Sequence, residues 1–185
     1  MKCPVCKTTD LYPAKLADGL PGFYCSSCEG QLIEILNYRH WCEQTSNNIK
    51  EQNSPGLNEP QDSSNALICP QCHKLMTKFG ISGKTTNKID LCSNCGRFWV
   101  DGGEWNLIKA LNLDTHLTKV FNEPWQKAIR AERALLEKNN VLQKLLSKED
   151  YQQLKRIKDW IDKQPCKKQI TEYINQEKQN TGSTK

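Results

Sequence analysis

The sequence predicts a small metal-bound α+β fold, in which two cysteine-rich ribbons are followed by an α-helical tail. Eight of the ten cysteines form four C-x-x-C pairs, and a polar, Asn- and Ser-rich stretch separates the first two pairs from the last two. The chain after Leu113 has a helical pattern and no glycine before Gly182. These observations divide the chain into a first ribbon (1–42), a flexible linker (43–66), a second ribbon with a short helix (67–113), a helical tail (114–176) and a disordered end (177–185).

The cysteines form two sets with nearly the same spacing. The first set has eighteen residues between its pairs and the second has nineteen; the sets are Cys3, Cys6, Cys25, Cys28 and Cys69, Cys72, Cys92, Cys95. Four thiolates in tetrahedral geometry suit Zn²⁺, although sulfur ligands also accept iron. The plain alternative, eight buried thiols acting as small apolar side chains, does not account for the repeated spacing. We therefore predict two zinc ribbons with two Zn²⁺ per chain, and structural zinc because four cysteines close the coordination sphere.

Each ribbon is expected to contain a short antiparallel β-hairpin. In the second ribbon, "KLMTKFGI" and "KTTNKIDL" alternate roughly between apolar and polar residues, with Ser82-Gly83 at the turn. The corresponding loop of the first ribbon contains Pro13, Gly19, Pro21 and Gly22, which predicts shorter strands.

Three helices are expected in the tail. Asn122 and Pro124 are a start signal for the first helix, and Ser147 with Asp150 resembles a capping box that starts the second. Pro165 ends the second helix, and a short third helix carries Ile170, Tyr173 and Ile174. The apolar faces of these helices predict packing on the second ribbon or a homodimer through the tail.

The stretch "CSNCGRFWVDGGE" resembles the TFIIB-type zinc-ribbon family, whose signature is CPxC, a hairpin, and then C-x-x-C-G-G-x-W-x-D-x-G-E. The resemblance covers about Leu67 to Leu113, and the chain departs from it at Arg97, where the family has a second glycine. In the first ribbon, Gly30, Leu32 and Glu34 stand in the places of Arg97, Trp99 and Asp101, so that ribbon is a degenerate copy. The resemblance implies a role in transcription or translation, and the helical tail is similar to the tail of some members.

We expect the tryptophan and the acidic residues of that stretch to have structural roles and not catalytic ones. We expect Trp99 to belong to the ribbon core, with base stacking as the alternative. Asp101 is expected to bond backbone amides in the turn, and Glu104 to cap a helix that starts near Trp105. Because no histidine or hydroxyl nucleophile accompanies this carboxylate pair, we predict that the protein is not an enzyme.

The charge gives only modest support for a nucleic-acid partner. The formal net charge is +5, but a zinc ion held by four thiolates has a net charge of −2, so two filled sites lower the total to about +1. Lys74, Lys78, Lys84 and Lys88 could form a basic stripe on the second hairpin. The candidate partner-binding residues are Lys74, Lys78 and Arg97, and Arg97 is expected to be exposed.

The predicted function is a non-enzymatic, zinc-binding adaptor or regulator that binds nucleic acid or the transcription or translation machinery. Two alternatives stay open: a zinc- or redox-responsive regulator in which Cys42 resolves the oxidised first site, and a purely protein–protein interaction module. The chain begins with "MKCPVC", a metal-ligand pattern and not a signal-peptide pattern. No apolar run is long enough to span a bilayer. We therefore predict a cytoplasmic protein with no membrane partner. No small-molecule substrate is evident.

Overall fold

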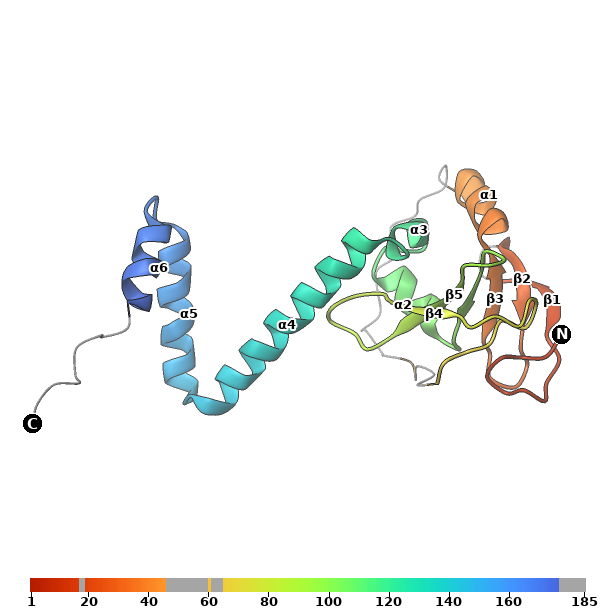
Figure 1. Cartoon of the computed structure of the whole chain (residues 1–185), viewed down its shortest axis with the longest axis horizontal. Helices are drawn as coiled ribbons and strands as arrows, with labels where there is room; N and C mark the ends of the chain where they lie inside the picture. Colours follow the sequence, from red (N-terminus) through yellow and green to blue (C-terminus); the bar gives the residue numbers. More distant parts are fainter. Residues whose placement is uncertain (17–18, 46–59, 61–64, 177–185) are drawn as a thin grey trace, which may run out of the picture. The chain divides into compact units, whose positions relative to one another are not determined.

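The computed structural model describes residues 1–16, 19–45, 60 and 65–176. The chain divides into two compact units, Met1–Ala134 and Leu135–Lys185. The first unit contains all the strands, and the second contains the last turns of one long helix and two further helices (Figure 1). The expected flexible segment 46–59 and 61–64, and the expected disordered end 177–185, lie outside the described residues.

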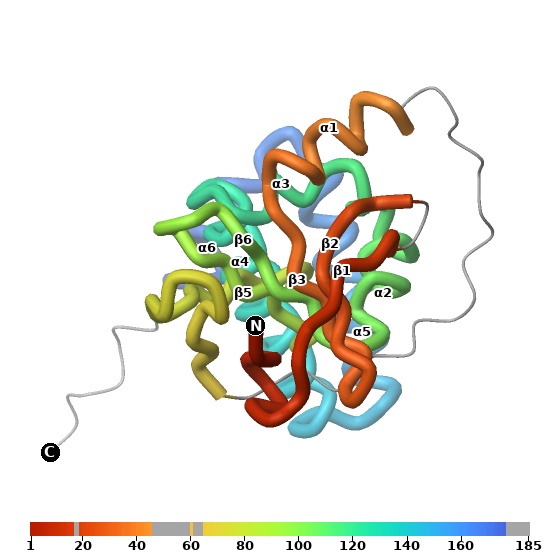
Figure 2. Tube along the Cα trace, turned by 90° about the vertical axis from the view of Figure 1, so that its right-hand side faces the viewer, coloured from red at the N-terminus to blue at the C-terminus, as the bar shows by residue number. Residues whose placement is uncertain are grey.

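One antiparallel sheet of six strands, in the order β1-β2-β3-β6-β5-β4, forms the frame of the first unit. We call β1, β2 and β3 the first half and β4, β5 and β6 the second half; Figure 2 shows them in red to orange and in yellow to green. The strands are Tyr12–Lys15, Pro21–Tyr24, Gln31–Glu34, Thr77–Gly80, Lys88–Cys92 and Arg97–Val100. The two predicted hairpins are confirmed. The first hairpin has slightly shorter strands, as predicted, since β1 and β2 have four residues each whereas β4 has four and β5 has five.

The two halves are joined edge to edge by β3 and β6. Leu32 pairs with Trp99 in this ladder, and Glu34 pairs with Arg97. Leu32 is the fourth residue after Cys28, and Trp99 is the fourth after Cys95, so equivalent positions of the two halves meet each other. This register defines an internal pseudo-twofold axis that passes through the Leu32–Trp99 pair. The two halves therefore form one continuous sheet within the first unit.

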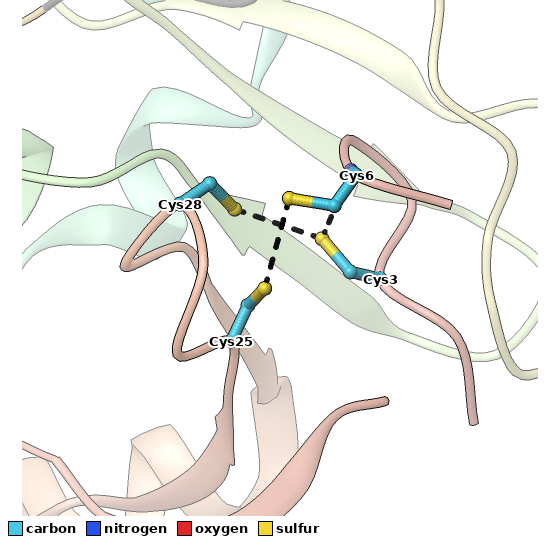
Figure 3. Close-up of side chains that lie close together, drawn as sticks. All are labelled: Cys3, Cys6, Cys25 and Cys28. Atoms are coloured by element: carbon cyan, nitrogen blue, oxygen red, sulfur yellow. Dashed lines mark hydrogen bonds between the residues drawn. The ribbon is translucent and has the colours of Figure 1, made fainter. Parts of the chain in front are cut away.

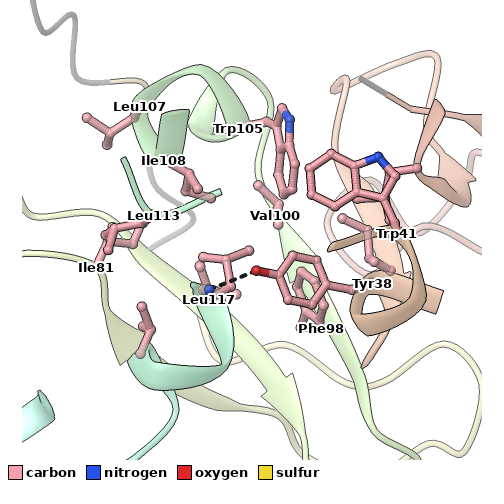
Figure 4. Close-up of a cluster of buried hydrophobic side chains, with 14 residues drawn as sticks. Tyr38, Trp41, Ile81, Phe98, Val100, Trp105, Leu107, Ile108, Leu113 and Leu117 are labelled. Atoms are coloured by element: carbon pink, nitrogen blue, oxygen red, sulfur yellow. Dashed lines mark hydrogen bonds between the residues drawn. The ribbon is translucent and has the colours of Figure 1, made fainter. Parts of the chain in front are cut away.

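Alternation along β3 and β6 divides their side chains between two apolar clusters. Ile33, Phe98 and Val100 belong to the larger cluster, which three helices complete (Figure 4). Leu32 and Trp99 belong to the second cluster, together with cysteines of both sets. The sheet is thus covered by helices on one side and by the cysteine-rich loops on the other.

The helices of the first unit are α1 (Ile35–Thr45), α2 (Glu104–Ala110) and α3 (Leu117–Val120). Helix α1 was not predicted, although Tyr38 and Trp41 have the i, i+3 spacing of a buried helix face and are 1% and 4% exposed. The Tyr38 hydroxyl donates to the carbonyl of Asp114 (2.8 Å) and accepts from the backbone N–H of Leu117 (2.9 Å), which fixes α1 against α3. Helix α1 also includes residues 43–45, which had been expected to begin the linker.

The three predicted tail helices are present as α4 (Glu123–Leu145), α5 (Lys148–Asp162) and α6 (Lys167–Asn175). Ser147 is the N-cap of α5, and its hydroxyl accepts from the backbone N–H of Asp150 (3.1 Å), as the capping-box prediction requires. The first turns of α4 belong to the first unit, where the Gln126 amide bonds both the N–H and the carbonyl of Gly80 at the edge of β4. Among the described residues, no helix combines the length and the apolar character needed to cross a bilayer.

Candidate metal centres

The structure gathers all eight predicted ligands into two tetrads of sulfur atoms. Within each tetrad, the four Sγ atoms lie within 4.8 Å of one another. In the first tetrad, the side chains of Cys3, Cys6, Cys25 and Cys28 point toward a common centre, with Sγ–Sγ distances of 3.6 and 3.8 Å across it (Figure 3). The corresponding distances in the second tetrad are 3.5 Å and 3.3 Å. A tetrahedral site with Zn–S bonds of about 2.3 Å requires sulfur atoms about 3.8 Å apart, so both tetrads fit a zinc ion.

The same backbone turn is built four times, once around each C-x-x-C pair. In every case, the residue after the second cysteine has a positive φ, between 58° and 66°, and its N–H donates to the carbonyl of the first cysteine at 2.8–2.9 Å. Three of these four residues, Lys7, Glu29 and His73, are not glycine, and the fourth is Gly96. A left-handed backbone conformation is unfavourable for residues other than glycine, so its presence at all four turns indicates a compensating gain for the site. The gain is that both sulfur atoms of a pair face the same point.

The pKa values of the thiols show which of them need a cation in order to lose their protons. Burial raises the pKa of Cys3 to about 11 and that of Cys69 to about 12. The backbone N–H of Lys74 lowers the pKa of Cys72 to about 6. Although burial opposes it, hydrogen bonds from the N–H groups of Cys28 and Ser27 hold the pKa of Cys25 at about 7. Each tetrad thus has a thiol with a lowered pKa and at least one with a raised pKa, which stays protonated unless a cation replaces its proton.

The polar residues of the signature stretch form a buried network behind the second tetrad. The Trp99 indole N–H donates to Asp101 (2.7 Å), and the Glu104 carboxylate accepts from the backbone N–H of Asp101 (2.9 Å) and from the Asn87 amide (3.1 Å). Trp99 is fully buried, which confirms its core position and excludes base stacking in this fold. The expected roles of the acids are corrected: Asp101 accepts from the indole, and Glu104 bonds the turn amide, that of Asp101 itself. The N-cap of α2 is Gly103, without a side-chain cap bond, so the predicted capping role of Glu104 is wrong.

The Asn87 amide also donates to the carbonyl of Pro60 (2.9 Å), the one described residue in the middle of the expected linker. Pro60 and Glu104 therefore share a donor, and the network holds this point of the chain against the second half. No sequence signal predicted Asn87, because its two partners, Pro60 and Glu104, come from two other segments of the chain.

The candidate partner-binding residues are less available than the sequence indicated. The Arg97 side chain is only 20% exposed and forms an ion pair with Glu34 across the β3–β6 ladder (2.9 Å), which corrects the expectation of an exposed residue. Lys78 forms an ion pair with Asp90 (2.9 Å), which is 1% exposed. Lys74 is exposed. Of the predicted lysine stripe, Lys74 and Lys84 are exposed and Lys88 is partly exposed, whereas Lys78 is committed to a buried acid.

The remaining cysteines and the histidines do not join the tetrads. Cys42 packs against the helix-covered cluster, and its thiol donates to the carbonyl of Thr115 (3.8 Å). This position is on the other side of the sheet from the tetrads, which removes the expected proximity of Cys42 to the first site. Cys166 and the three histidines are exposed.

Comparison with known proteins gives no relative: no family model, no curated protein and no solved structure matches the chain. The conclusions about this protein therefore depend on its own residues. They define a small α+β protein with two four-cysteine groups that can each hold a metal ion.

Proposed function

We propose that this chain is a structural-zinc adaptor, a non-enzymatic protein whose metal ions stabilise a binding surface for a protein partner. Zinc is the ion that suits four thiolates at tetrahedral spacing, and four cysteines leave no open position for a substrate or a reactive water molecule. The carboxylates of Asp101 and Glu104 are committed to buried hydrogen bonds. The metal would hold the cysteine-rich side of the sheet together.

The proposed binding of a protein partner rests on a difference between equivalent positions of the two halves. In each half, an isolated β-bridge closes the first C-x-x-C turn, and the residue before the first cysteine forms one side of it. In the first half this bridge joins Lys2 to Asp10, which form an ion pair (2.7 Å). In the second half it joins Ile68 to Leu75, which are 48% and 64% exposed.

The first half shows that this bridge forms without apolar residues. The exposure of Ile68 and Leu75 therefore costs hydration free energy without a structural need in this fold. An exposed apolar pair beside a rigid metal site is a suitable anchor for a protein, whereas nucleic acid is bound mainly through cations. The ion pairs of Lys78 and Arg97 weaken the nucleic-acid alternative further. The TFIIB-type resemblance supports a partner in the transcription or translation machinery.

The first experiment measures metal by elemental analysis of the natively purified chain. Two zinc ions per chain are expected, together with a large loss of stability against urea, followed by circular dichroism, when a chelator removes them. Zinc bound at four cysteines supplies about 10–16 kcal/mol of apparent folding free energy in small domains. Iron in place of zinc, or a fold that is indifferent to chelation, would contradict the proposal.

The second experiment transfers the polar pair of the first half to the second, as Ile68→Lys with Leu75→Asp. Partners crosslinked to the native chain should be lost from this variant, while the zinc content stays at two. Leu36→Lys is the matched control, because Leu36 is also an exposed apolar residue of the first unit (67%). Salt-dependent binding to labelled RNA or DNA that both variants retain would instead favour the nucleic-acid alternative.

A further inference from the structure

The two tetrads share one apolar cluster. The most buried cysteines of both sets, Cys3 and Cys25 from the first and Cys69 and Cys92 from the second, are at most 1% exposed and belong to the same cluster. Leu32 and Trp99, the pair on the pseudo-twofold axis, belong to it too. Ordering either tetrad therefore orders part of the packing around the other.

Each half also supports the last C-x-x-C turn of the other half. The backbone N–H of Ile35 in the first half donates to the carbonyl of Gly96, which directly follows Cys95 (2.9 Å). In the second half, Gly102 lies against the backbone of Cys28, so closely that a Cβ at Gly102 would be 2.5 Å from the Cys28 carbonyl oxygen. Ile35 is seven residues after Cys28, and Gly102 is seven residues after Cys95. Ile35 and Gly102 therefore occupy equivalent positions, and a Cβ at Gly102 would also lie close to the Cβ of Glu29 (3.2 Å), the equivalent of Gly96.

The Trp99 ring connects the halves at a third point. It lies against Gly30, two residues after Cys28, where a Cβ would be 2.1 Å from the ring carbon Cζ2. The same ring is held in the second half by the hydrogen bond from its N–H to Asp101. A change in the position of Trp99 must therefore displace the backbone that follows the first tetrad.

We infer that the two tetrads bind metal cooperatively, so that the first zinc ion to bind raises the affinity of the other site. The first ion orders strands and turns that the second site also needs, and the conformational entropy cost of that ordering is met once for both sites. This inference rests on the proposed function, because it requires both tetrads to hold zinc. The linkage is reciprocal, so either site can be the first to fill.

The test is native mass spectrometry of the full metal-free chain, equilibrated with one molar equivalent of zinc. Two independent sites, whatever their affinities, leave at least about half of the chains with a single ion when the average occupancy is one. A tenfold coupling between equal sites lowers that fraction to about a quarter. We expect a singly loaded fraction well below half, with empty and doubly loaded chains in excess. A singly loaded fraction of half or more overturns the inference.

A ligand variant provides a second measurement. Cys6→Ser removes one ligand from the first tetrad, and the zinc affinity of the second tetrad is then measured by competition with a chromophoric chelator. At least a tenfold weaker second site is expected relative to the matched control Cys166→Ser, which changes an exposed cysteine outside both tetrads. An unchanged affinity of the second site in Cys6→Ser overturns the inference.

The outcomes also separate this inference from the proposed function. A native chain that binds no zinc, or that folds equally well without it, contradicts the proposed function. A chain that binds two zinc ions and needs them to fold, but has mostly singly loaded molecules at one equivalent, contradicts the cooperativity alone.

Discussion

Leu32 lies directly opposite Trp99 on the neighbouring strand, and each is the fourth residue after the last cysteine of its own tetrad. Equivalent positions that pair with each other place the two halves about a common axis, as in a symmetric dimer whose subunits have been joined. Both metal centres therefore depend on the same packed cluster, and changes in one half are expected to affect the other.

Replacement of a ligand cysteine should have a different effect from replacement of a cysteine outside the tetrads. Cys25→Ser removes a fully buried thiol from the first tetrad and should lower the zinc content measured by elemental analysis, with loss of ordered structure in the first unit. Cys42→Ser, on the helix-covered side, should retain two zinc ions. A Cys42→Ser variant with lowered zinc content would contradict this placement.

Metal removal should make the fold sensitive to alkali. Burial raises the pKa of Cys3 to about 11 and that of Cys69 to about 12, so the metal-free fold favours both thiols in their protonated form. The stability that this supplies is fully present below the ordinary thiol pKa of about 8.5 and is lost as the pH rises through that value toward the folded pKa. In the zinc-loaded chain these sulfur atoms already bind as thiolates, and acid, which displaces the metal, is the destabilising condition.

Urea denaturation at several pH values measures this difference. The chelated chain should lose stability between about pH 8.5 and pH 11, whereas the zinc-loaded chain should lose it as the pH falls and protons compete for the thiolates. Parallel pH dependences for the two forms would show that the thiolates do not bind a metal.

Gly30→Ala should destabilise the first unit although it changes no ligand. The added Cβ would lie 2.1 Å from the Trp99 ring, which is fully buried and cannot move freely. Overpacking of this kind typically costs about 1–3 kcal/mol. Gly80→Ala is the control, because its nearest neighbour would be 3.4 Å away, and thermal denaturation of the zinc-loaded proteins compares the two. Equal melting temperatures for the two variants would contradict the close contact.

The helical unit is expected to associate with a second copy. Helices α5 and α6 have no buried residue, and Leu154, Ile157 and Trp160 on α5 are 37%, 47% and 56% exposed. Sedimentation of the full chain should show a concentration-dependent dimer, and Trp160→Glu should weaken it, because a carboxylate in an apolar interface is costly. Tyr173→Glu tests whether the exposed face of α6 takes part. Monomers at all concentrations would contradict self-association and favour another partner for this face.

Local signals predicted the metal ligands and the tail helices because the chemistry of each is set by residues close in sequence. The spacing of Cys69 and Cys72 already places two sulfur atoms on one side of a turn, and the hydroxyl of Ser147 reaches an N–H only three residues away. These features need no knowledge of the rest of the chain.

The pairing of β3 with β6 could not be predicted in the same way, because it depends on contacts between residues more than sixty positions apart. The position of Arg97 next to a turn predicts an exposed side chain, but its exposure is set by the neighbouring strand, which brings Glu34 beside it. Similarly, Asn87 and Pro60 are twenty-seven positions apart and become partners only when the second half has folded.

The contact between Trp99 and Gly30 explains why the second half can have arginine where the resemblance predicts glycine. Under the pseudo-twofold axis, the residue that corresponds to Trp99 is Leu32, and the position that corresponds to Gly30 is Arg97. One half thus provides the large ring and the other provides the recess that receives it. Two identical halves would oppose ring to ring or leave both recesses empty. The two halves therefore have equivalent backbones but complementary side chains, and one cannot replace the other at this contact.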